Sequence, residues 1–301
     1  MSNSTLFIRL SPLIFVLIWS TGFIAAKYSM QNADPFVFLC LRMALTTLVL
    51  IPILYLSGVT LPRNFWPYRH DMMTGVILHC CYLGFVFWPI KQGMPSGIVA
   101  IIIGIQPILT MVIASFYIGE SITAKKIIGL VIGFVGVAIV ILGKFGLGLI
   151  DNNGLGLLPV GMCLVSLLSA SSSIIYQKKF CDQSHLLTGV LMQYVAATLA
   201  TAVFAFTLGE NWQVAWSTSF AIALTWQVFG ISIGGVVLLM SIIKLGEASR
   251  ISSMFYLVPP LVVIESHYLF GETLSFVSIA GMALCIGSVY FVNRPALNAP
   301  N

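Results

Sequence analysis

The segment that decides the fold reads QPILTMVIASFYIGESITAKKIIG over residues 106–129, and a related segment reads VPPLVVIESHYLFGETLSFVSIAG over residues 258–281. In both copies a proline lies inside an apolar run, a Gly-Glu pair closes that run, and a glycine follows early in the next run. The copies are offset by 152 residues (258 minus 106), about half of the chain. Three matched features at one offset indicate an internal duplication, so we interpret the chain as two homologous halves.

The composition excludes a soluble globular protein. Hydrophobic residues make up 59% of the chain and charged residues only 8%, whereas about 25% of an ordinary soluble domain is charged. So few charges cannot cover a surface that faces water, so most of the chain lies in lipid. The formal net charge is +5, but the sequence has no basic run or stripe, and we expect no nucleic-acid partner.

Ten apolar segments are each long enough to cross a membrane as a helix, which takes about 20 residues. They cover residues 12–31, 35–57, 71–91, 95–118, 124–143, 156–177, 186–208, 225–244, 249–270 and 275–292. Short connections rich in turn residues separate them and leave no room for a soluble domain. We therefore expect an all-α polytopic membrane protein with ten transmembrane helices.

The middle of the chain separates the two halves. Residues 145–155 are rich in glycine and asparagine, as linkers are, so the first repeat covers residues 1–144 and the second covers 156–294. Residues 295–301 form a short C-terminal tail. Each half holds five helices, and an odd number inverts the second half relative to the first. Inverted five-helix repeats are typical of alternating-access transporters, with the substrate near the membrane midplane.

The positions of lysine and arginine predict the orientation of the helices. With the N-terminus inside, ten basic residues fall at inner ends: Arg9, Arg63, Arg69, Lys125, Lys126, Lys178, Lys179, Lys244, Arg250 and Arg294. Three fall at outer ends: Lys27, Lys91 and Lys144. Cytoplasmic loops carry an excess of basic residues, so we expect both termini in the cytoplasm and the protein in the inner or plasma membrane.

With these features, the chain resembles the ten-helix, EamA-type transporters of the drug/metabolite transporter superfamily. The residues that carry the resemblance are Trp19-Ser20-Thr21-Gly22-Phe23, Lys27, Pro35, Arg42 and the two copies of the Pro, Gly-Glu and Gly segment. The sixth helix departs from the pattern, because it lacks a Trp-Gly start. The resemblance implies export or import of small metabolites, often amino acids, without ATP hydrolysis. The branch is broad, so it does not name the substrate.

Arg42 is the first candidate for a functional residue, because it lies seven residues inside the second apolar segment. An arginine in the membrane costs about 2.5–3.5 kcal/mol on insertion scales, so it should face protein or water. One interpretation is a site for a substrate carboxylate or a gating ion pair. The other is a structural lock on backbone carbonyls or a helix end.

Glu265 is the second candidate, because an acidic residue inside an apolar segment is also costly. Its counterpart in the first half is Ile113, so the repeat itself does not require a carboxylate here. We expect Glu265 to be a protonatable coupling residue, which makes protons a candidate coupling ion. The alternatives are an ion pair with Arg42, His267 or Lys27, or extension to the outer surface.

Four further side chains are candidates for the wall of a substrate cavity: Trp19, His79, Tyr82 and Tyr256. His79 and Tyr82 share one helix face, because they are three residues apart. For Trp19 the alternative is simple packing between helices. Pro107 and Pro259 each remove a backbone donor inside an apolar segment, so we expect two hinges or, alternatively, two static kinks.

Motifs of enzymes and of metal or cofactor sites are absent from the sequence. It contains no Walker A or HExxH motif, and its six cysteines show no CxxC spacing. We therefore expect no enzyme activity, metal or cofactor. The predicted function is secondary active transport of small metabolites by alternating access. Alternatives are a lipid or lipid-headgroup flippase and a membrane scaffold or receptor without flux. The sequence leaves the substrate, the direction, the coupling ion and the oligomeric state open.

Overall fold

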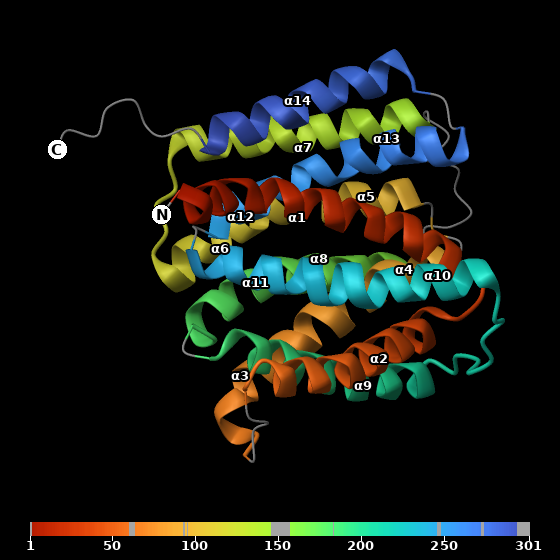
Figure 1. Cartoon of the computed structure of the whole chain (residues 1–301). Helices are drawn as coiled ribbons and strands as arrows, with labels where there is room; N and C mark the ends of the chain where they lie inside the picture. Colours follow the sequence, from red (N-terminus) through yellow and green to blue (C-terminus); the bar gives the residue numbers. More distant parts are fainter. Residues whose placement is uncertain are drawn as a thin grey trace.

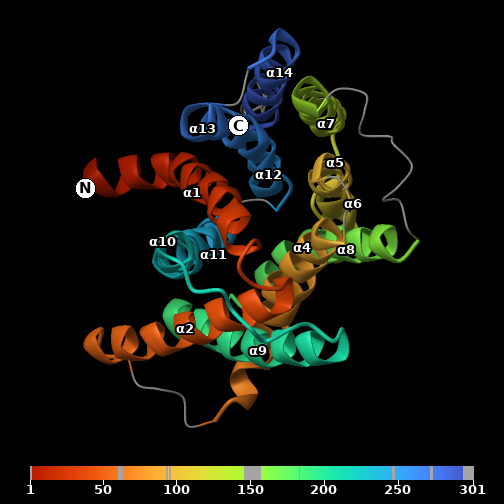
Figure 2. The ribbon, with the colours of Figure 1, turned by 90° about the vertical axis from the view of Figure 1, so that its right-hand side faces the viewer.

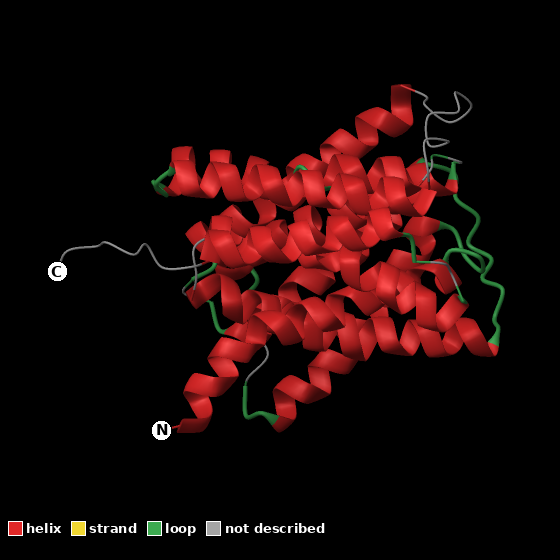
Figure 3. Ribbon diagram, turned by 90° about the horizontal axis from the view of Figure 1, so that it is seen from above, coloured by secondary structure: helices red, strands yellow, loops and turns green. Residues whose placement is uncertain are grey.

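The computed structural model describes residues 2–59, 64–92, 94, 96–145, 157–182, 184–245, 248–271 and 274–293. Every element in this part of the chain is helical, and the helices lie roughly side by side with short connections at the two ends of the bundle (Figure 1, Figure 3). The expected linker at 145–155, apart from Phe145, and the expected tail at 295–301 lie outside the described residues, as does Glu272. The side chains of six basic residues that predicted the orientation also lie outside: Arg9, Lys27, Arg63, Lys144, Arg250 and Arg294.

The helices form ten spans, which we number in chain order. The first half consists of α1 (Ser2–Ser29), α2 (Pro35–Leu56), span 3 built from α3 (Arg69–Gly75), η2 (Val76–Tyr82) and α4 (Leu83–Lys91), span 4 built from α5 (Ser96–Ile103) and α6 (Gln106–Ile118), and α7 (Ala124–Phe145). The second half consists of α8 (Leu157–Phe180), α9 (Leu186–Thr207), span 8 built from α10 (Thr218–Trp226), η4 (Gln227–Gly235) and α11 (Val236–Leu245), span 9 built from α12 (Ala248–Ser253), η5 (Met254–Leu257) and α13 (Val258–Phe270), and α14 (Phe276–Asn293). A short helix, η1 (Trp66–Tyr68), precedes span 3.

The ten expected helices are all present. Eight spans are long and apolar enough to cross a membrane. Span 1 contributes a shorter apolar stretch, Leu10–Ala26, and η5 divides span 9. Span 8 begins at Thr218, seven residues before the expected start at 225, because the Ser217 side chain caps it by accepting a hydrogen bond from the Phe220 amide at 3.1 Å.

The irregular turns are duplicated together with the helices. Both η2 and η4 are π-helical, and they begin 151 residues apart (227 minus 76) in the matched spans 3 and 8. Gly119 and Gly271 end α6 and α13 in the left-handed conformation, with φ of +69° and +66°. Glycine adopts this conformation without the steric penalty of a Cβ. The duplication therefore extends to backbone geometry that a hydropathy pattern does not report.

Pro107 and Pro259 do not kink a continuous helix. Each lies in the first turn of a new helix, α6 or α13, after a break in its span. The break is at Gly104–Ile105 in span 4 and at the 3-10 turn η5 in span 9. A proline in a first helical turn costs little, because the amide that it lacks has no partner within the helix there. The two spans are thus already divided at the proposed hinge positions.

The helices of one half pack against helices of the other half, and these contacts are repeated when the two halves are interchanged, as in a pseudo-two-fold symmetric arrangement. α2 packs along its counterpart α9 at one edge of the bundle, and α7 packs along its counterpart α14 at the opposite edge (Figure 2). α6 packs on α8, and its counterpart α13 packs in the matching way on α1. α7 and α14 run in opposite directions, and α1 begins at the end where α14 finishes (Figure 1). These relations are those of two inverted five-helix repeats.

The close approach of α7 and α14 can be tested by substituting glycines of α14. A Cβ at Gly281 would lie 2.6 Å from the Val140 backbone nitrogen and 2.8 Å from the Gly136 carbonyl oxygen, whereas a Cβ at Gly287 meets nothing within 4 Å. We predict that Gly281→Ala destabilises the protein by about 1–3 kcal/mol, because it overpacks a close helix contact. Gly287→Ala, in the same helix, should have little effect. Thermal unfolding of both variants in detergent measures the difference; equal melting temperatures would contradict the packing.

Candidate functional site

A small cavity lies between spans 1, 2, 3 and 8, and both halves of the chain line it. Its volume is about 30 Å³, whereas ligand pockets usually measure about 300–1,000 Å³. The wall includes Trp19, Phe23, Arg42, Tyr82, Gln227 and Ile231. In this conformation the cavity has room for water but not for a metabolite, so a substrate would enter only after the spans separate.

The two π-helical segments contribute side chains to this cavity from both halves. Tyr82 ends η2, and Gln227 and Ile231 lie in η4. Single π-helical turns inside α-helices occur frequently at functional sites, because the wide turn re-aims side chains and frees backbone groups. Their presence at matched positions on two sides of one cavity singles this place out within the bundle.

Arg42 is buried, with 3% of its surface exposed, and it contributes to the cavity wall. Its Nε donates a hydrogen bond of 2.8 Å to the Ser232 hydroxyl in η4. The Tyr194 hydroxyl donates to the Ser232 carbonyl at 2.9 Å and supports this contact from α9. Within the part of the chain that the structure describes, no carboxylate pairs with the guanidinium, so its remaining donors are available to a ligand in the cavity.

Trp19, Tyr82 and Gln227 complete the wall around Arg42. Trp19 is held by ring contacts with Phe15 at 5.1 Å and Phe255 at 5.9 Å between centroids. The Gln227 side chain is 1% exposed and donates from Nε2 to the Gly22 carbonyl at 3.0 Å. Its Oε1 is buried without a hydrogen-bond partner among the described residues. A buried, unpaired acceptor is costly, and here it lies beside the cavity.

His79 and Tyr256 lie outside this cavity. The His79 ring stacks on Tyr194 at 4.5 Å between centroids, and its Nε2 is buried without a partner among the described residues. Tyr256 packs on the other side of the bundle, in a cluster with α7 and α14, where the absence of a Cβ at Gly133 leaves room for its ring. The sequence predicted both residues in a cavity wall, but their packing directs them towards other neighbours.

Glu265 joins α13 to α1 and does not pair with Arg42. The Ser20 hydroxyl donates to one carboxylate oxygen of Glu265, while the other oxygen is buried without a partner in the described structure. Ser20 follows Trp19 directly, so Glu265 contacts the helix that lines the cavity without reaching into it. Of the six candidate side chains, the structure therefore brings Trp19, Arg42 and Tyr82 together around one cavity.

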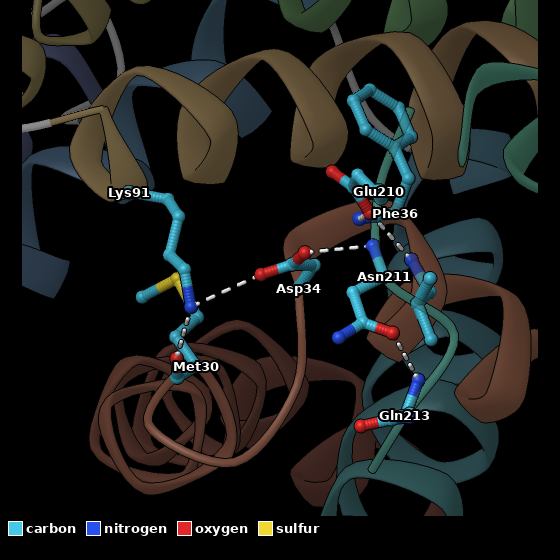
Figure 4. Close-up of polar contacts among 8 residues, drawn as sticks. Met30, Asp34, Phe36, Lys91, Glu210, Asn211 and Gln213 are labelled. Atoms are coloured by element: carbon cyan, nitrogen blue, oxygen red, sulfur yellow. Dashed lines mark hydrogen bonds and ion pairs between the residues drawn. The ribbon is translucent and has the colours of Figure 1, made fainter. Parts of the chain in front are cut away.

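Lys91 closes one end of the bundle, at the C-terminal end of span 3 (Figure 4). Its Nζ lies 3.1 Å from Asp34 Oδ1 and donates to the Met30 carbonyl at 3.4 Å. Asp34 Oδ2 also accepts from the Asn211 amide at 3.0 Å. We call this set of contacts the Lys91 latch. It ties the end of span 3 to the α1–α2 connection and to the α9–α10 connection.

Lys244 makes the corresponding contact at the opposite end, near the C-terminal end of span 8. Its Nζ donates to the carbonyls of Asp182 at 3.0 Å and Ser184 at 2.9 Å. The Ser184 hydroxyl donates to the buried Asp71 at 2.6 Å, which brings in the start of span 3. We call these contacts the Lys244 latch. Lys91 and Lys244 are 153 residues apart (244 minus 91) in matched spans, and each holds the connection before the second span of its half.

The model of the EamA-like transporter family matches residues 6–142 and 157–294. The chain belongs to this family. This EamA-family chain is 25% identical over 287 residues to the uncharacterized transporter YvbV of Bacillus subtilis, a match that covers 92% of this chain and 88% of that one. It is 22% identical over 288 residues to a probable amino-acid metabolite efflux pump of Salmonella typhimurium, covering 92% of each chain.

A solved crystal structure shares the fold of this EamA-family transporter. It aligns with a TM-score of 0.77 at 16% identity, over 95% of this chain and 97% of the other. Such low identity establishes a shared fold alone. The family match makes this chain a multi-pass membrane transporter rather than an enzyme.

Sequence reasoning missed several residues at these sites. Gln227 and Ser232 carried a usable signal, because they are polar residues in an apolar segment. Lys91 and Lys244 also carried a usable signal, because they lie at the ends of matched helices and their separation is nearly the repeat offset. Glu210 carried none, because nothing in the α9–α10 connection indicates that this residue caps α2.

Glu210 caps α2 from the α9–α10 connection. Its Oε2 accepts hydrogen bonds from the amides of Phe36 at 2.8 Å and Val37 at 2.9 Å (Figure 4). An acidic side chain at a helix N-terminus is favourable. Burial nevertheless raises the pKa of Glu210 to about 7, because it outweighs these two hydrogen bonds.

This shift predicts a pH dependence of stability. The folded state holds the Glu210 proton more tightly than the unfolded chain, whose glutamates titrate near a pKa of about 4.3. The stabilising contribution is therefore complete below about pH 4 and is lost as the pH rises through about 7. We predict that Glu210→Gln flattens the melting temperature between pH 5 and 8, while Asp182→Asn, at an exposed carboxylate elsewhere, keeps the wild-type profile. Parallel profiles for wild type and Glu210→Gln would contradict the shift.

Proposed function

We propose that this protein is a secondary active transporter that exports small metabolites, amino acids or related compounds, by alternating access. The observation that carries the proposal is the cavity around the buried Arg42, which both halves line and which lies between two latches at opposite ends of the bundle. The similarity to a probable amino-acid metabolite efflux pump supports the substrate class and the direction. We place the protein in the inner membrane with both termini in the cytoplasm, which puts the Lys91 latch outside and the Lys244 latch inside.

The contacts of the two latches are weak, so each latch could open and close as a gate. The side chains of the Lys91–Asp34 pair are 39% and 27% exposed, and such exposed pairs contribute about 0–1 kcal/mol. Among the described residues, the Lys244 contact uses two backbone carbonyls and no ion pair. One latch would open while the other holds, and the divided spans 4 and 9 would bend at their breaks before Pro107 and Pro259. The α7–α14 contact, by contrast, is too close to slide freely.

Glu265 is our proposed coupling residue. One carboxylate oxygen is bonded to Ser20 and the other is buried without a described partner, so binding of a proton would remove a poorly compensated charge. Protonation would change the contact between α13 and α1, and α1 lines the cavity. A coupling ion drives transport only if it binds the two facing states with different affinity.

Flux into proteoliposomes with an imposed pH gradient tests the coupling. We predict that the gradient accelerates wild-type transport of an accepted metabolite about tenfold or more, equivalent to about 1.4 kcal/mol. Glu265→Gln should retain substrate binding and exchange but lose the response to the gradient. Glu120→Gln, a carboxylate in the connection between α6 and α7, is the matched control and should behave as wild type. A gradient response that survives Glu265→Gln would assign coupling elsewhere.

Access to the cavity from the two sides tests the latches. In a background with the six native cysteines replaced, Val86→Cys places a thiol in the cavity wall. We predict that Lys91→Met speeds labelling by a membrane-impermeant maleimide about threefold or more from the Lys91 side only, because removing a weak ion pair shifts the opening equilibrium by that amount. Lys244→Met should do the same from the opposite side.

Lys179→Met is the control for lost surface charge, since among the described residues the Lys179 ammonium contacts Tyr117 of α6 and its neighbour Phe180 at the Lys244 end. It should change labelling from neither side. If Lys91→Met and Lys244→Met speed labelling from the same side, or not at all, the two latches are not opposing gates.

A further inference from the structure

Among the described residues, the cavity wall has one charge and no counter-charge. Arg42 is the only charged residue of the described part of the chain that lines it. The chain has nine acidic residues, and the six that are described all lie elsewhere. Asp34 and Glu210 lie at the Lys91 end, Asp71, Glu120 and Asp182 lie at the Lys244 end, and Glu265 is held by Ser20. The wall that the described residues form is therefore cationic and contains no carboxylate.

A free amino acid fits this wall poorly. Its carboxylate would bind Arg42, and its ammonium group would then lie only a few ångströms from the guanidinium in a medium of low dielectric constant. Like charges at that distance repel strongly when water is excluded. A buried ammonium also needs a carboxylate or several acceptors to replace its hydration. The wall offers Gln227 Oε1 as a neutral acceptor but no acidic partner.

A carboxylate with a neutral N–H group fits the same wall well. The planar guanidinium presents paired donors that match the two oxygens of a carboxylate. The Gln227 amide is fixed by its bond to Gly22, and its free Oε1 can accept one N–H. Trp19, Tyr82 and Phe87 supply aromatic surface for an apolar body. Each element of the wall then has a partner in the ligand.

We propose that the cavity selects monocarboxylates with an apolar body and an uncharged nitrogen, of which N-acylated amino acids are the chemical class, over free zwitterionic amino acids. This inference rests on the proposed transport through the cavity and narrows its substrate class. Arg42 binds the carboxylate, Gln227 accepts the amide N–H, and the aromatic wall holds the side chain. A 2-oxo acid satisfies Arg42 but leaves Gln227 unpaired, so it ranks between the N-acylated and the free amino acid.

The test compares N-acetylphenylalanine, phenylpyruvate, phenylalanine and phenethylamine on the wild-type protein. Binding is measured by calorimetry in detergent, and flux is measured separately in proteoliposomes. We expect N-acetylphenylalanine to bind about tenfold or more tightly than phenylalanine, which is about 1.4 kcal/mol, with phenylpyruvate between them and no binding of phenethylamine. Phenylalanine that binds as tightly as N-acetylphenylalanine overturns the inference, and this comparison needs no variant.

Two variants then assign the contacts. Gln227→Met should lose the preference for N-acetylphenylalanine over phenylpyruvate while keeping phenylpyruvate binding, and Gln92→Met, at an exposed glutamine, should keep both. Arg42→Lys should weaken both carboxylates about tenfold, because a lysine cannot make the paired contact. Unchanged binding in Gln227→Met and Arg42→Lys overturns the assignment. Tight binding without flux refutes the transport function, whereas flux that prefers phenylalanine refutes this inference and leaves transport standing.

Discussion

The hydrogen bond from Arg42 to Ser232 connects the two halves of the protein at the cavity. A buried arginine in lipid must find partners within the protein, and Arg42 finds one on η4 of the other half at 2.8 Å. One donor position is thereby occupied, and the charge remains without a carboxylate in the described structure. This arrangement holds α2 against span 8, brings Tyr194 to Ser232, and leaves a cationic group in the wall of an otherwise apolar cavity.

The pseudo-two-fold symmetry between the halves explains why the cavity has matched features on two sides. Each half supplies a π-helical segment, a lysine latch and a span divided before a proline. Because the halves are inverted, each matched pair is distributed over the two ends or the two sides of the bundle. In an inverted-repeat transporter, the two members of such a pair can take opposite roles in the inward-facing and outward-facing states.

The protein combines a closely packed helix contact with weak polar contacts. α7 and α14 approach so closely at Gly136 and Gly281 that a methyl group would not fit. The latches are exposed ion pairs or contacts to backbone carbonyls, whose free energies are small. The cavity lies between the two latches. Both latches are made in the structure in which the cavity has this small volume.

The sequence by itself determined the class of protein, the ten spans, the duplication and the inversion, because hydropathy, counting and the repeat offset depend only on the order of residues. It also showed which polar residues lie inside apolar segments. The tertiary structure decided which of them meet: it placed Trp19, Arg42 and Tyr82 around one cavity, turned His79 towards Tyr194 and joined Glu265 to Ser20. A helix that is apolar all round carries no stripe that marks its buried face, so its rotation is set only by packing against its neighbours.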